Sequence, residues 1–371
     1  MLRWPVRVPV RTSFGTMHDR PAVLVRIEDA DGAHGWGEAW CNFPSCGAEH
    51  RARLIETVLT PLLVEGRFAT PEAAFDELTR RTAVLALQSG EPGPIAQAIA
   101  GVDIALHDLA ARRAGQPLWR RLAGAGAAPV DAGRPQVAVY ASGINPDGAG
   151  AAVAALRASG HVAFKLKVGF GAERDLDNLR EVRAAAGVDA MLMVDANQAW
   201  DIEAALAMSD RLDGFGLAWL EEPLRADRPM QEWQALAAAA SMPLAAGENG
   251  IGEAAFDALI AARAVSVVQP DLAKWGGVSG VLRVVARIEA AGLRYCPHYL
   301  GAGLGLLASA HVLAASGSSA ALLEVDSNEN PLRTALCPPL AGLEAGRIQL
   351  DDSPGIGVDV DHAGLLALCA R

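Results

Sequence analysis

The sequence predicts an α/β fold in which a parallel β/α barrel follows a smaller α+β domain. From residue 137 onward, short β-like runs alternate with helical stretches, which is the pattern of a parallel sheet covered by helices. The preceding part of the chain instead combines a hairpin pattern with a long helical stretch. With 371 residues, 51% of them hydrophobic, the chain can bury a core in each part.

The N-terminal domain begins with a predicted hairpin. The sequence AVLVRIEDADGAHGWGEA at 22–39 contains two alternating runs around the turn pair Asp31-Gly32. Helical periodicity then covers roughly 48–123, and the Ala-, Gly- and Pro-rich segment 124–135 is a predicted linker. The predicted domains are residues 1–123, the N-terminal α+β domain; residues 124–335, the β/α barrel with the active site; and residues 336–371, a turn-rich tail that packs back toward the first domain.

Eight predicted strands make up the barrel. Their sequences are QVAVYAS (136–142), VAFKLKVG (162–169), AMLMVDAN (190–197), GLAWLEEP (216–223), MPLAAGEN (242–249), VSVVQPD (265–271), LRYCPH (293–298) and AALLEVD (320–326). Helical segments such as ERDLDNLREVRAAAG and SGVLRVVARIEAAG separate the strands, with glycine at their ends. Eight alternating strands are typical of a closed parallel barrel, and a doubly wound open sheet is the alternative.

The composition excludes several kinds of partner. The formal net charge is −11 and there is no basic tract, so we expect no nucleic-acid partner. We also expect no membrane partner, because no apolar run has membrane-spanning length and the N-terminus lacks the apolar core of a signal peptide. Five scattered cysteines without a CxxC pair indicate reduced thiols in a cytoplasmic protein. We expect a homo-oligomer that acts on a small molecule.

Charged side chains lie near the ends of seven consecutive predicted strands. They are Lys167, Asp195, Glu221, Glu248, Asp271, His298 and Glu324. Neighbouring members are 23 to 28 residues apart, about the length of one strand–helix–strand unit. The C-terminal ends of parallel barrel strands meet at one rim, where barrel enzymes have their active sites. The sequence therefore predicts a single site at this rim.

Three carboxylates in this set, Asp195, Glu221 and Glu248, come from consecutive strands. One strand-end carboxylate alone would more simply cap the next helix. Three that converge repel one another unless a cation neutralises them, and an all-oxygen set favours Mg²⁺ or Mn²⁺ over zinc. We therefore predict a Mg²⁺ site, with Mn²⁺ as the other candidate.

Two lysines share one face of the predicted strand at 164–171. In FKLKVGFG, Lys165 and Lys167 point to the same side because side chains alternate along a strand. On an exposed strand they would form a solvated face without a function. Buried beside a metal-bound anionic substrate, each would lower the pKa of the other toward that of a working base.

The remaining charged strand ends suggest further acid–base groups. Asp271 and His298 end successive strands, and an Asp–His pair would orient the imidazole as a base. Glu324 is either a buried structural acid or, if protonated, a hydrogen-bond donor to a developing oxyanion. His107 and His311 lie within apolar helical runs, so we expect them to be satisfied core residues.

An ordered set of motifs covers almost the whole chain. They are KLK (165–167), DAN (195–197), EEP (221–223), GEN (247–249), QPDLAKWGG (269–277), PHYLG (297–301) and LLEVD (322–326), with GVDIALHDLAARRAGQPLWRRLAG (101–124) in the first domain. This set resembles the enolase superfamily, in its mandelate racemase subgroup. The resemblance implies a modified TIM-type (β/α)7β barrel with an N-terminal α+β capping domain, Mg²⁺ on the three carboxylates, and abstraction of the proton next to a substrate carboxylate.

The resemblance also implies roles for individual residues. Lys167 would be one acid/base, and Lys165 would assist it and the substrate carboxylate. His298, backed by Asp271, would be the acid/base on the opposite face, and Glu324 would donate to the carboxylate. Muconate-lactonising and dipeptide-epimerising relatives carry a lysine base where this chain has Asp271, which argues against those subgroups.

The reaction remains open among three types that all use Lys167 and His298. Most subgroup members dehydrate sugar acids, so we expect a Mg²⁺-dependent lyase of acid-sugar catabolism that forms a 2-keto-3-deoxy acid. The alternatives are an isomerase, either a racemase/epimerase of a 2-hydroxy acid or a sugar-acid lactone cycloisomerase. A non-catalytic metal-stabilised protein is disfavoured, because no acid/base residue is missing.

Candidate substrate contacts come from the first domain and one barrel motif. His18 and Arg20, in RTSFGTMHDRP at 11–21, suit a polyhydroxylated acid, whereas Trp40 suits a smaller or more apolar ligand. Asn197 is expected to contact the ligand because the DAN motif resembles the family's. On balance these loops favour a sugar acid.

Overall fold

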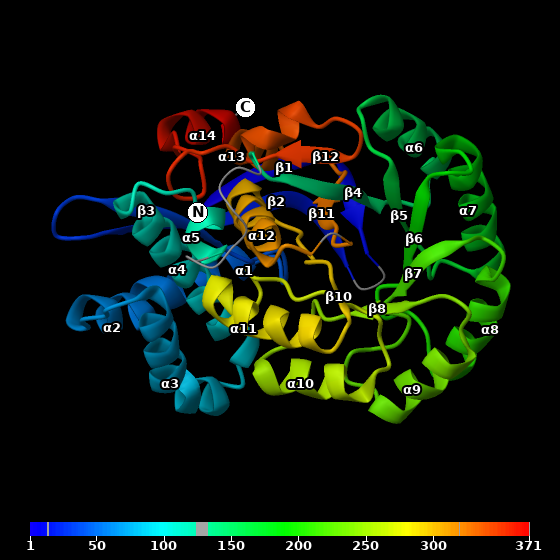
Figure 1. The fold of residues 1–371 in the computed structure, drawn as a ribbon, viewed down its shortest axis with the longest axis horizontal. Coiled ribbons are helices and arrows are strands. Elements are labelled where there is room, and N and C mark those ends of the chain that lie inside the picture. The colour runs from blue at the N-terminus through cyan, green and yellow to red at the C-terminus, as the bar shows by residue number, and fades with distance from the viewer. Residues whose placement is uncertain (13–14, 124–132, 319, 371) are drawn as a thin grey trace.

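The computed structural model describes residues 1–12, 15–123, 133–318 and 320–370 (Figure 1). Most of the predicted linker at 124–135 lies outside these residues. The described chain forms an N-terminal α+β domain, a curled parallel sheet with helices around it, and a C-terminal segment. Within the described ranges, no helix is long and apolar enough to cross a membrane.

A three-stranded antiparallel sheet begins the N-terminal domain. Its strands, in the order β1-β2-β3, are β1 (Leu2–Arg11), β2 (Thr16–Glu28) and β3 (His34–Ala39). The predicted hairpin is confirmed, because β2 pairs with β3 from Val23 opposite Ala39 to Glu28 opposite His34. The helices that follow are α1 (Gly47–Leu54), the π-helical turn η1 (Ile55–Leu59), α2 (Thr60–Glu65), α3 (Pro71–Ser89), α4 (Pro92–Arg113) and α5 (Leu118–Ala123).

Strand β3 and helix α4 pack at very short range. A Cβ atom at Gly37 would lie 2.2 Å from the carbonyl oxygen of Gly101, and one at Gly35 would lie 2.2 Å from that of Ala105. Only glycine therefore fits at positions 35 and 37 on the helix-facing side of β3. Because side chains alternate along a strand, Glu38 points to the other side, away from α4.

Strands and helices alternate throughout the second part of the chain. They are β4 (Gln136–Ile144), α6 (Ala149–Ala158), β5 (Ala163–Lys167), α7 (Ala172–Ala186), β6 (Met191–Asp195), α8 (Ile202–Leu212), β7 (Leu217–Glu221), α9 (Met230–Ala239), β8 (Leu244–Ala246), α10 (Glu253–Ala262), β9 (Val267–Val268), α11 (Gly277–Ala290), β10 (Arg294–Tyr295), α12 (Gly303–Ser316) and β11 (Leu323–Asp326). Seven β/α units and a final strand make a (β/α)7β arrangement, as predicted. Figure 1 shows α6 to α11 around the outside of the strands.

The strand order distinguishes a barrel from an open sheet. Parallel pairing runs in the order β10-β9-β8-β7-β6-β5-β4-β11. The last barrel strand thus pairs with the first, with Glu324 opposite Tyr140 and Asp326 opposite Ser142. A doubly wound open sheet would not return to its first strand in this way. The predicted modified barrel is confirmed.

The barrel interior and the helix layer bury different faces of each strand. Tyr140, Met193, Trp219 and Val267 form a cluster with alternate residues of neighbouring strands, separate from the larger core under the helices. The ring of Trp219 contacts that of Tyr140 edge-on at 5.4 Å between centroids. Bulky side chains in this cluster fill the barrel below its C-terminal rim and leave the rim for polar groups.

The C-terminal segment returns to the N-terminal domain. Its elements are α13 (Pro331–Leu336), the 3-10 helix η3 (Pro338–Gly342), β12 (Arg347–Gln349) and α14 (His362–Cys369). The Ile356 amide donates to Asp108 of α4 at 2.7 Å. His311 of α12 joins this segment to α5, because its Nδ1 accepts from the Trp119 amide at 3.0 Å and its Nε2 lies 3.2 Å from the Ile356 carbonyl. His107 is likewise a buried structural residue, 2.9 Å from the Ser279 hydroxyl.

We predict that His311 makes stability depend on pH. Burial lowers the pKa of His311 to about 4, so the unfolded chain takes up its proton near pH 6.5 while the folded chain does not. Stability should fall as the pH drops through this window, by at most about 3 kcal/mol from this residue. Urea unfolding at pH 7 and pH 4.5 should show a smaller pH effect for His311→Asn than for the wild type.

The control for this prediction is His362→Asn, which alters an exposed histidine. It should keep the pH dependence of the wild type. Equal pH dependence for His311→Asn and the wild type would contradict the prediction.

Candidate active site

The two lysines of β5 are buried inside the barrel. Lys165 is 1% exposed and Lys167 is 7% exposed, so they do not form a solvated face. Lys167 is paired with Asp195 of β6, and Asp195 with Glu221 of β7, in the parallel ladder. Strand pairing thus sets three charged residues side by side at the rim, as their spacing predicted.

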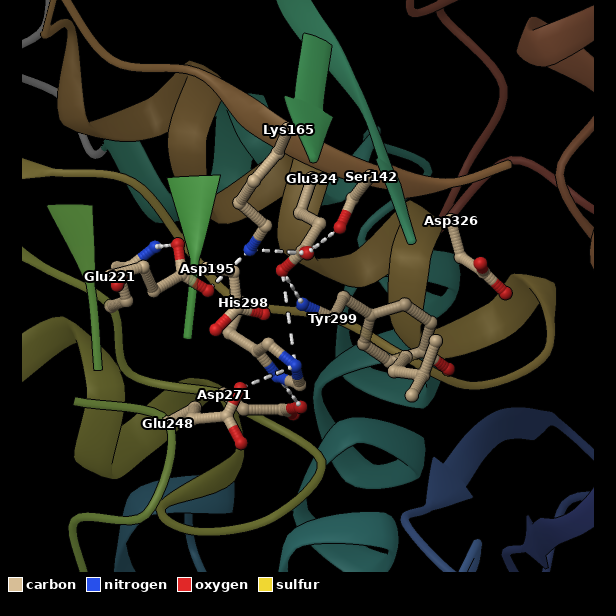
Figure 2. Close-up of polar contacts among 12 residues, drawn as sticks. Ser142, Lys165, Asp195, Glu221, Glu248, Asp271, His298, Tyr299, Glu324 and Asp326 are labelled. Atoms are coloured by element: carbon tan, nitrogen blue, oxygen red, sulfur yellow. Dashed lines mark hydrogen bonds and ion pairs between the residues drawn. The ribbon is translucent and has the colours of Figure 1, made fainter. Parts of the chain in front are cut away.

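Lys165 lies between two carboxylates (Figure 2). Its ammonium forms an ion pair with Glu221 and another, of 2.8 Å, with Glu324. Burial alone would lower the pKa of Lys165, but the charges of Glu221 and Glu324 raise it well above its ordinary value. The expectation that the neighbouring lysine lowers this pKa is therefore wrong for Lys165, because two carboxylates form ion pairs with its ammonium.

The carboxylates on β6 and β7 are each held by polar neighbours. Asp195 accepts from the amide and the side chain of Asn197, both at 2.8 Å. Glu221 accepts from Trp219 Nε1 at 2.9 Å and from Gln269 Nε2 at 2.6 Å. Burial raises the pKa of Glu221 to about 7 against the opposing effect of Lys165, and it also raises that of Asp195. A further positive charge beside these two carboxylates would favour their ionised forms.

Asp271 and His298 form the predicted pair. His298 Nδ1 lies 2.7 Å from Asp271 Oδ2, and His298 Nε2 lies 2.8 Å from Glu248. Asp271 is itself held, because its Oδ1 accepts from the Ala273 amide at 2.8 Å. Burial would lower the pKa of His298, but Glu248 and Glu324 raise it well above its ordinary value. Asp271 therefore fixes the ring orientation and leaves Nε2 for the site.

Glu324, on β11, accepts hydrogen bonds from two directions. The Ser142 hydroxyl donates to one carboxylate oxygen, and the Tyr299 amide donates to the other at 3.1 Å. Burial would raise the pKa of Glu324, but Lys165 and His298 lower it below its ordinary value. Of the two alternatives for Glu324, this favours an ionised acceptor over a protonated donor.

One cavity opens above these residues, with a volume of about 240 Å³. Its polar lining from the barrel side is Ser142, Lys167, Asp195, Asn197, Gln198, Glu248, Asn249, Lys274, His298, Glu324 and Asn328, and the N-terminal domain adds Val10, Thr12, Trp40 and Phe43. Lys165, Glu221 and Asp271 are buried and do not line the cavity. Both domains therefore shape the space available to a ligand.

Several lining residues lacked a strong sequence signal. Gln198 and Asn328 follow predicted strand ends by one and two residues, and this position is the only signal that could have identified them. Asn249 is the last residue of the predicted strand at 242–249 and of the GEN motif, and that motif could have identified it. Lys274 donates to Asn249 Oδ1 at 2.9 Å and lies over the Trp40 ring, 5.0 Å from its centroid. The cavity thus holds a further cation beside the predicted groups.

The four candidate substrate contacts have different positions. Asn197 and Trp40 line the cavity, whereas Arg20 and His18 do not. Arg20 is 1% exposed and pairs with Asp326 at 2.5 Å, so its charge is already compensated inside the protein. His18 is exposed on β2. We therefore assign neither of them to substrate binding.

The donor set fits a hard divalent cation. In the part of the chain that the structure describes, no three His, Cys, Asp or Glu side chains are arranged as a ready metal site. Lys165 and His298 instead compensate Glu221 and Glu248. Among the described atoms, the buried Glu222 Oε2 has no hydrogen-bond partner. Carboxylates on three neighbouring strands, with a further unpaired oxygen beside them, are the ligand chemistry that Mg²⁺ prefers.

Comparisons with known proteins agree with the motifs. Residues 1–123 match the model of the mandelate racemase/muconate lactonizing enzyme N-terminal domain, and residues 149–364 match that of the enolase C-terminal domain-like family. D-galactarolactone cycloisomerase of Agrobacterium fabrum is 32% identical over 98% of this chain and 96% of its own length.

Solved structures show the same relationship. A mandelate racemase/muconate lactonizing enzyme from Bordetella bronchiseptica is 58% identical, with a TM-score of 0.91 over 100% of both chains. L-talarate/galactarate dehydratase from Salmonella typhimurium, solved with Mg and L-lyxarohydroxamate, is 28% identical, with a TM-score of 0.81 over 98% of this chain and 89% of its own. The cycloisomerase is an isomerase and the dehydratase is a lyase. The chain is an enzyme of the mandelate racemase/muconate lactonizing enzyme family, in the enolase superfamily.

Proposed function

We propose that this enzyme dehydrates a sugar acid to a 2-keto-3-deoxy acid in a Mg²⁺-dependent reaction. One observation carries the proposal: a single cavity is lined by two basic groups, Lys167 and His298, and by two carboxylates, Asp195 and Glu248. The basic groups come from well-separated strands, so they approach a bound ligand from different directions. Two such groups are what removal of an α-proton and departure of a β-hydroxyl require.

Asp195, Glu221 and Glu248 would hold the cation. When bound, Mg²⁺ supplies Lewis-acid stabilisation of the negative charge that develops on the substrate carboxylate. The relative from Salmonella typhimurium, solved with Mg, supports this assignment. Lys165, next to Glu221 and Glu324, adds a fixed positive charge close to the same place.

Lys167 and His298 would move the protons. Lys167, whose Nζ donates to Asn197 Oδ1 at 3.1 Å, would as the neutral amine remove the proton from the α-carbon and become the ammonium. His298, with Nδ1 held by Asp271, would present Nε2 to the leaving hydroxyl and give it a proton. Glu324 would hold Lys165 and the Tyr299 amide in place beside the substrate carboxylate. The enol formed by loss of water then becomes the ketone.

Lactone cycloisomerisation is the second candidate function. The Agrobacterium fabrum relative, which matches 98% of this chain, is named for that reaction. The first step is shared, because the α-proton next to a free carboxylate is removed in both reactions. The leaving group differs: it is the ring oxygen of the lactone instead of a hydroxyl. Racemisation would use the same two bases without any leaving group.

A substrate panel tests the proposed function. We expect a new ketone when the enzyme and Mg²⁺ are incubated with galactarate, L-talarate, arabinonate or rhamnonate, detected by ketone derivatisation and by ¹H NMR in D₂O. Ring opening of D-galactarolactone without ketone formation from the acids would favour the cycloisomerase. Inversion of the α-carbon alone would identify a racemase or epimerase. If neither turnover nor α-deuterium incorporation occurs with any panel member, the sugar-acid assignment is wrong.

The metal assignment predicts loss of Mg²⁺ binding when a ligand is changed. Asp195→Asn, Glu221→Gln and Glu248→Gln should each lower Mg²⁺ affinity by at least about 100-fold and abolish turnover, because each removes one anionic oxygen donor. Isothermal titration calorimetry measures the affinity, and circular dichroism checks the fold. Glu203→Gln, on the exposed side of α8, is the control. Wild-type affinity in any folded ligand variant would exclude that residue from the site.

The two-base assignment predicts separable effects. Lys167→Met and His298→Asn should each lower turnover by about 100-fold or more. His298→Asn should still exchange the α-proton with D₂O, because Lys167 remains to remove it. Mass spectrometry of recovered substrate measures this exchange. His362→Asn, which changes an exposed histidine, should behave as the wild type. Unchanged turnover in His298→Asn would show that this residue is not an acid/base.

A further inference from the structure

We infer that Glu38, a buried carboxylate of the N-terminal domain, is a positioning residue for His298. The inference rests on the proposed function, in which His298 is an acid/base. Glu38 is on β3, is 2% exposed, and points away from α4 toward the barrel. It does not line the cavity, so it acts on the chemistry through another residue.

Glu38 holds the N-terminus of the helix that follows His298. One carboxylate oxygen accepts from the Ala302 amide at 2.6 Å, and the other accepts from the Gly305 amide at 3.1 Å. These amides lie at the start of α12, where the first four amides have no partner within the helix. A carboxylate there is favoured by hydrogen bonding and by the helix dipole. One side chain thus fixes the start of α12 from outside the barrel.

The segment between His298 and α12 has little freedom to shift. The Tyr299 amide donates to Glu324 at 3.1 Å, and Asn42 donates to the Leu300 carbonyl at 2.5 Å. A Cβ atom at Gly301 would lie 2.4 Å from the Tyr299 hydroxyl and 2.7 Å from Glu38 Oε1. The segment therefore packs directly on the Glu38 carboxylate, and loss of that carboxylate removes its support within four residues of His298.

The C-terminal end of β3 also contacts the loop that carries Asp271, the partner of His298. The Trp40 amide, two residues after Glu38, donates to the Ala273 carbonyl at 3.2 Å, and Ala273 in turn donates to Asp271. The 2.7 Å contact between Asp271 and His298 thus joins two loops that both contact the C-terminal end of β3. Because misplacement by about 1 Å can cost about 100-fold in rate, this support bears on catalysis as well as on folding.

The test compares Glu38→Gln with a matched control, Asp108→Asn. Glutamine keeps the size of the side chain, but its amide group cannot accept from the second backbone N–H. Asp108 is also a buried carboxylate of the N-terminal domain, and it accepts from the Trp36 and Ile356 amides at 2.8 and 2.7 Å, away from the cavity. Both variants lose a similar structural contact, but only Glu38→Gln should affect His298. Glu38→Asp is the second variant if Glu38→Gln does not fold.

The first measurement needs no substrate. The Nδ1 proton of His298, shared with Asp271, should give a far-downfield ¹H NMR resonance that is absent in His298→Asn. We expect this resonance to shift or broaden in Glu38→Gln and to stay unchanged in Asp108→Asn. A wild-type resonance in folded Glu38→Gln, or the same change in both variants, would overturn the inference.

The second measurement uses the panel member with the highest turnover. Glu38→Gln should lower kcat by about 100-fold, with KM within about twofold of the wild type, and it should retain α-proton exchange as His298→Asn does. Asp108→Asn should keep the wild-type kcat. An inactive wild-type enzyme would contradict the proposed function, while the NMR resonance would still test the positioning role. An active wild type with an equally active Glu38→Gln would overturn the positioning role alone.

Discussion

The ion pairs of Lys165 with Glu221 and Glu324 are the interaction on which the rest of the site depends. All three side chains are almost fully buried, and removing each charge from water costs several kcal/mol. The charges are tolerated because they compensate one another across β5, β7 and β11, and because the Tyr140 ring lies 5.3 Å from the ammonium. Loss of one partner would leave an uncompensated charge inside the barrel. The ion pairs that the proposed chemistry uses therefore also hold β5, β7 and β11 together.

The positive charges of the site do not balance its negative charges, and the excess is negative. The cations Lys165, Lys167, Lys274 and His298 face the carboxylates Asp195, Glu221, Glu222, Glu248, Asp271 and Glu324. Burial and mutual repulsion raise the pKa of Asp195, Glu221 and Glu222 above their ordinary values. A divalent cation would relieve that repulsion and would release Lys165 and His298 from their carboxylate partners toward a ligand. The proposed metal chemistry therefore follows from this excess of buried negative charge.

Contacts that are determined by position along a strand are predictable from this sequence. The spacing of Lys167, Asp195 and Glu221 predicted their adjacency, because parallel strands in register bring their C-terminal ends together. Contacts with a partner remote in sequence are not predictable in this way: the sequence makes Arg20 a candidate substrate contact, but its partner Asp326 lies 306 residues later. The pKa of Lys165 is raised, and not lowered as the sequence suggests, for the same reason. Burial and partner number depend on tertiary packing, which neither periodicity nor spacing specifies.

The residues at the C-terminal end of β3 both line the cavity and contact the loop that carries Asp271. Trp40 forms part of the cavity wall, and its amide also contacts the loop after Asp271. On α4, Asp103 accepts from Ser279 at the start of α11, much as Glu38 does at the start of α12. The N-terminal domain therefore holds the two helices that follow the Asp271 and His298 loops while it closes the cavity above them. The contacts that support the pair are made by the Trp40 backbone amide and the Glu38 carboxylate, so side chains in the cavity wall can change without moving the pair as long as these contacts are preserved.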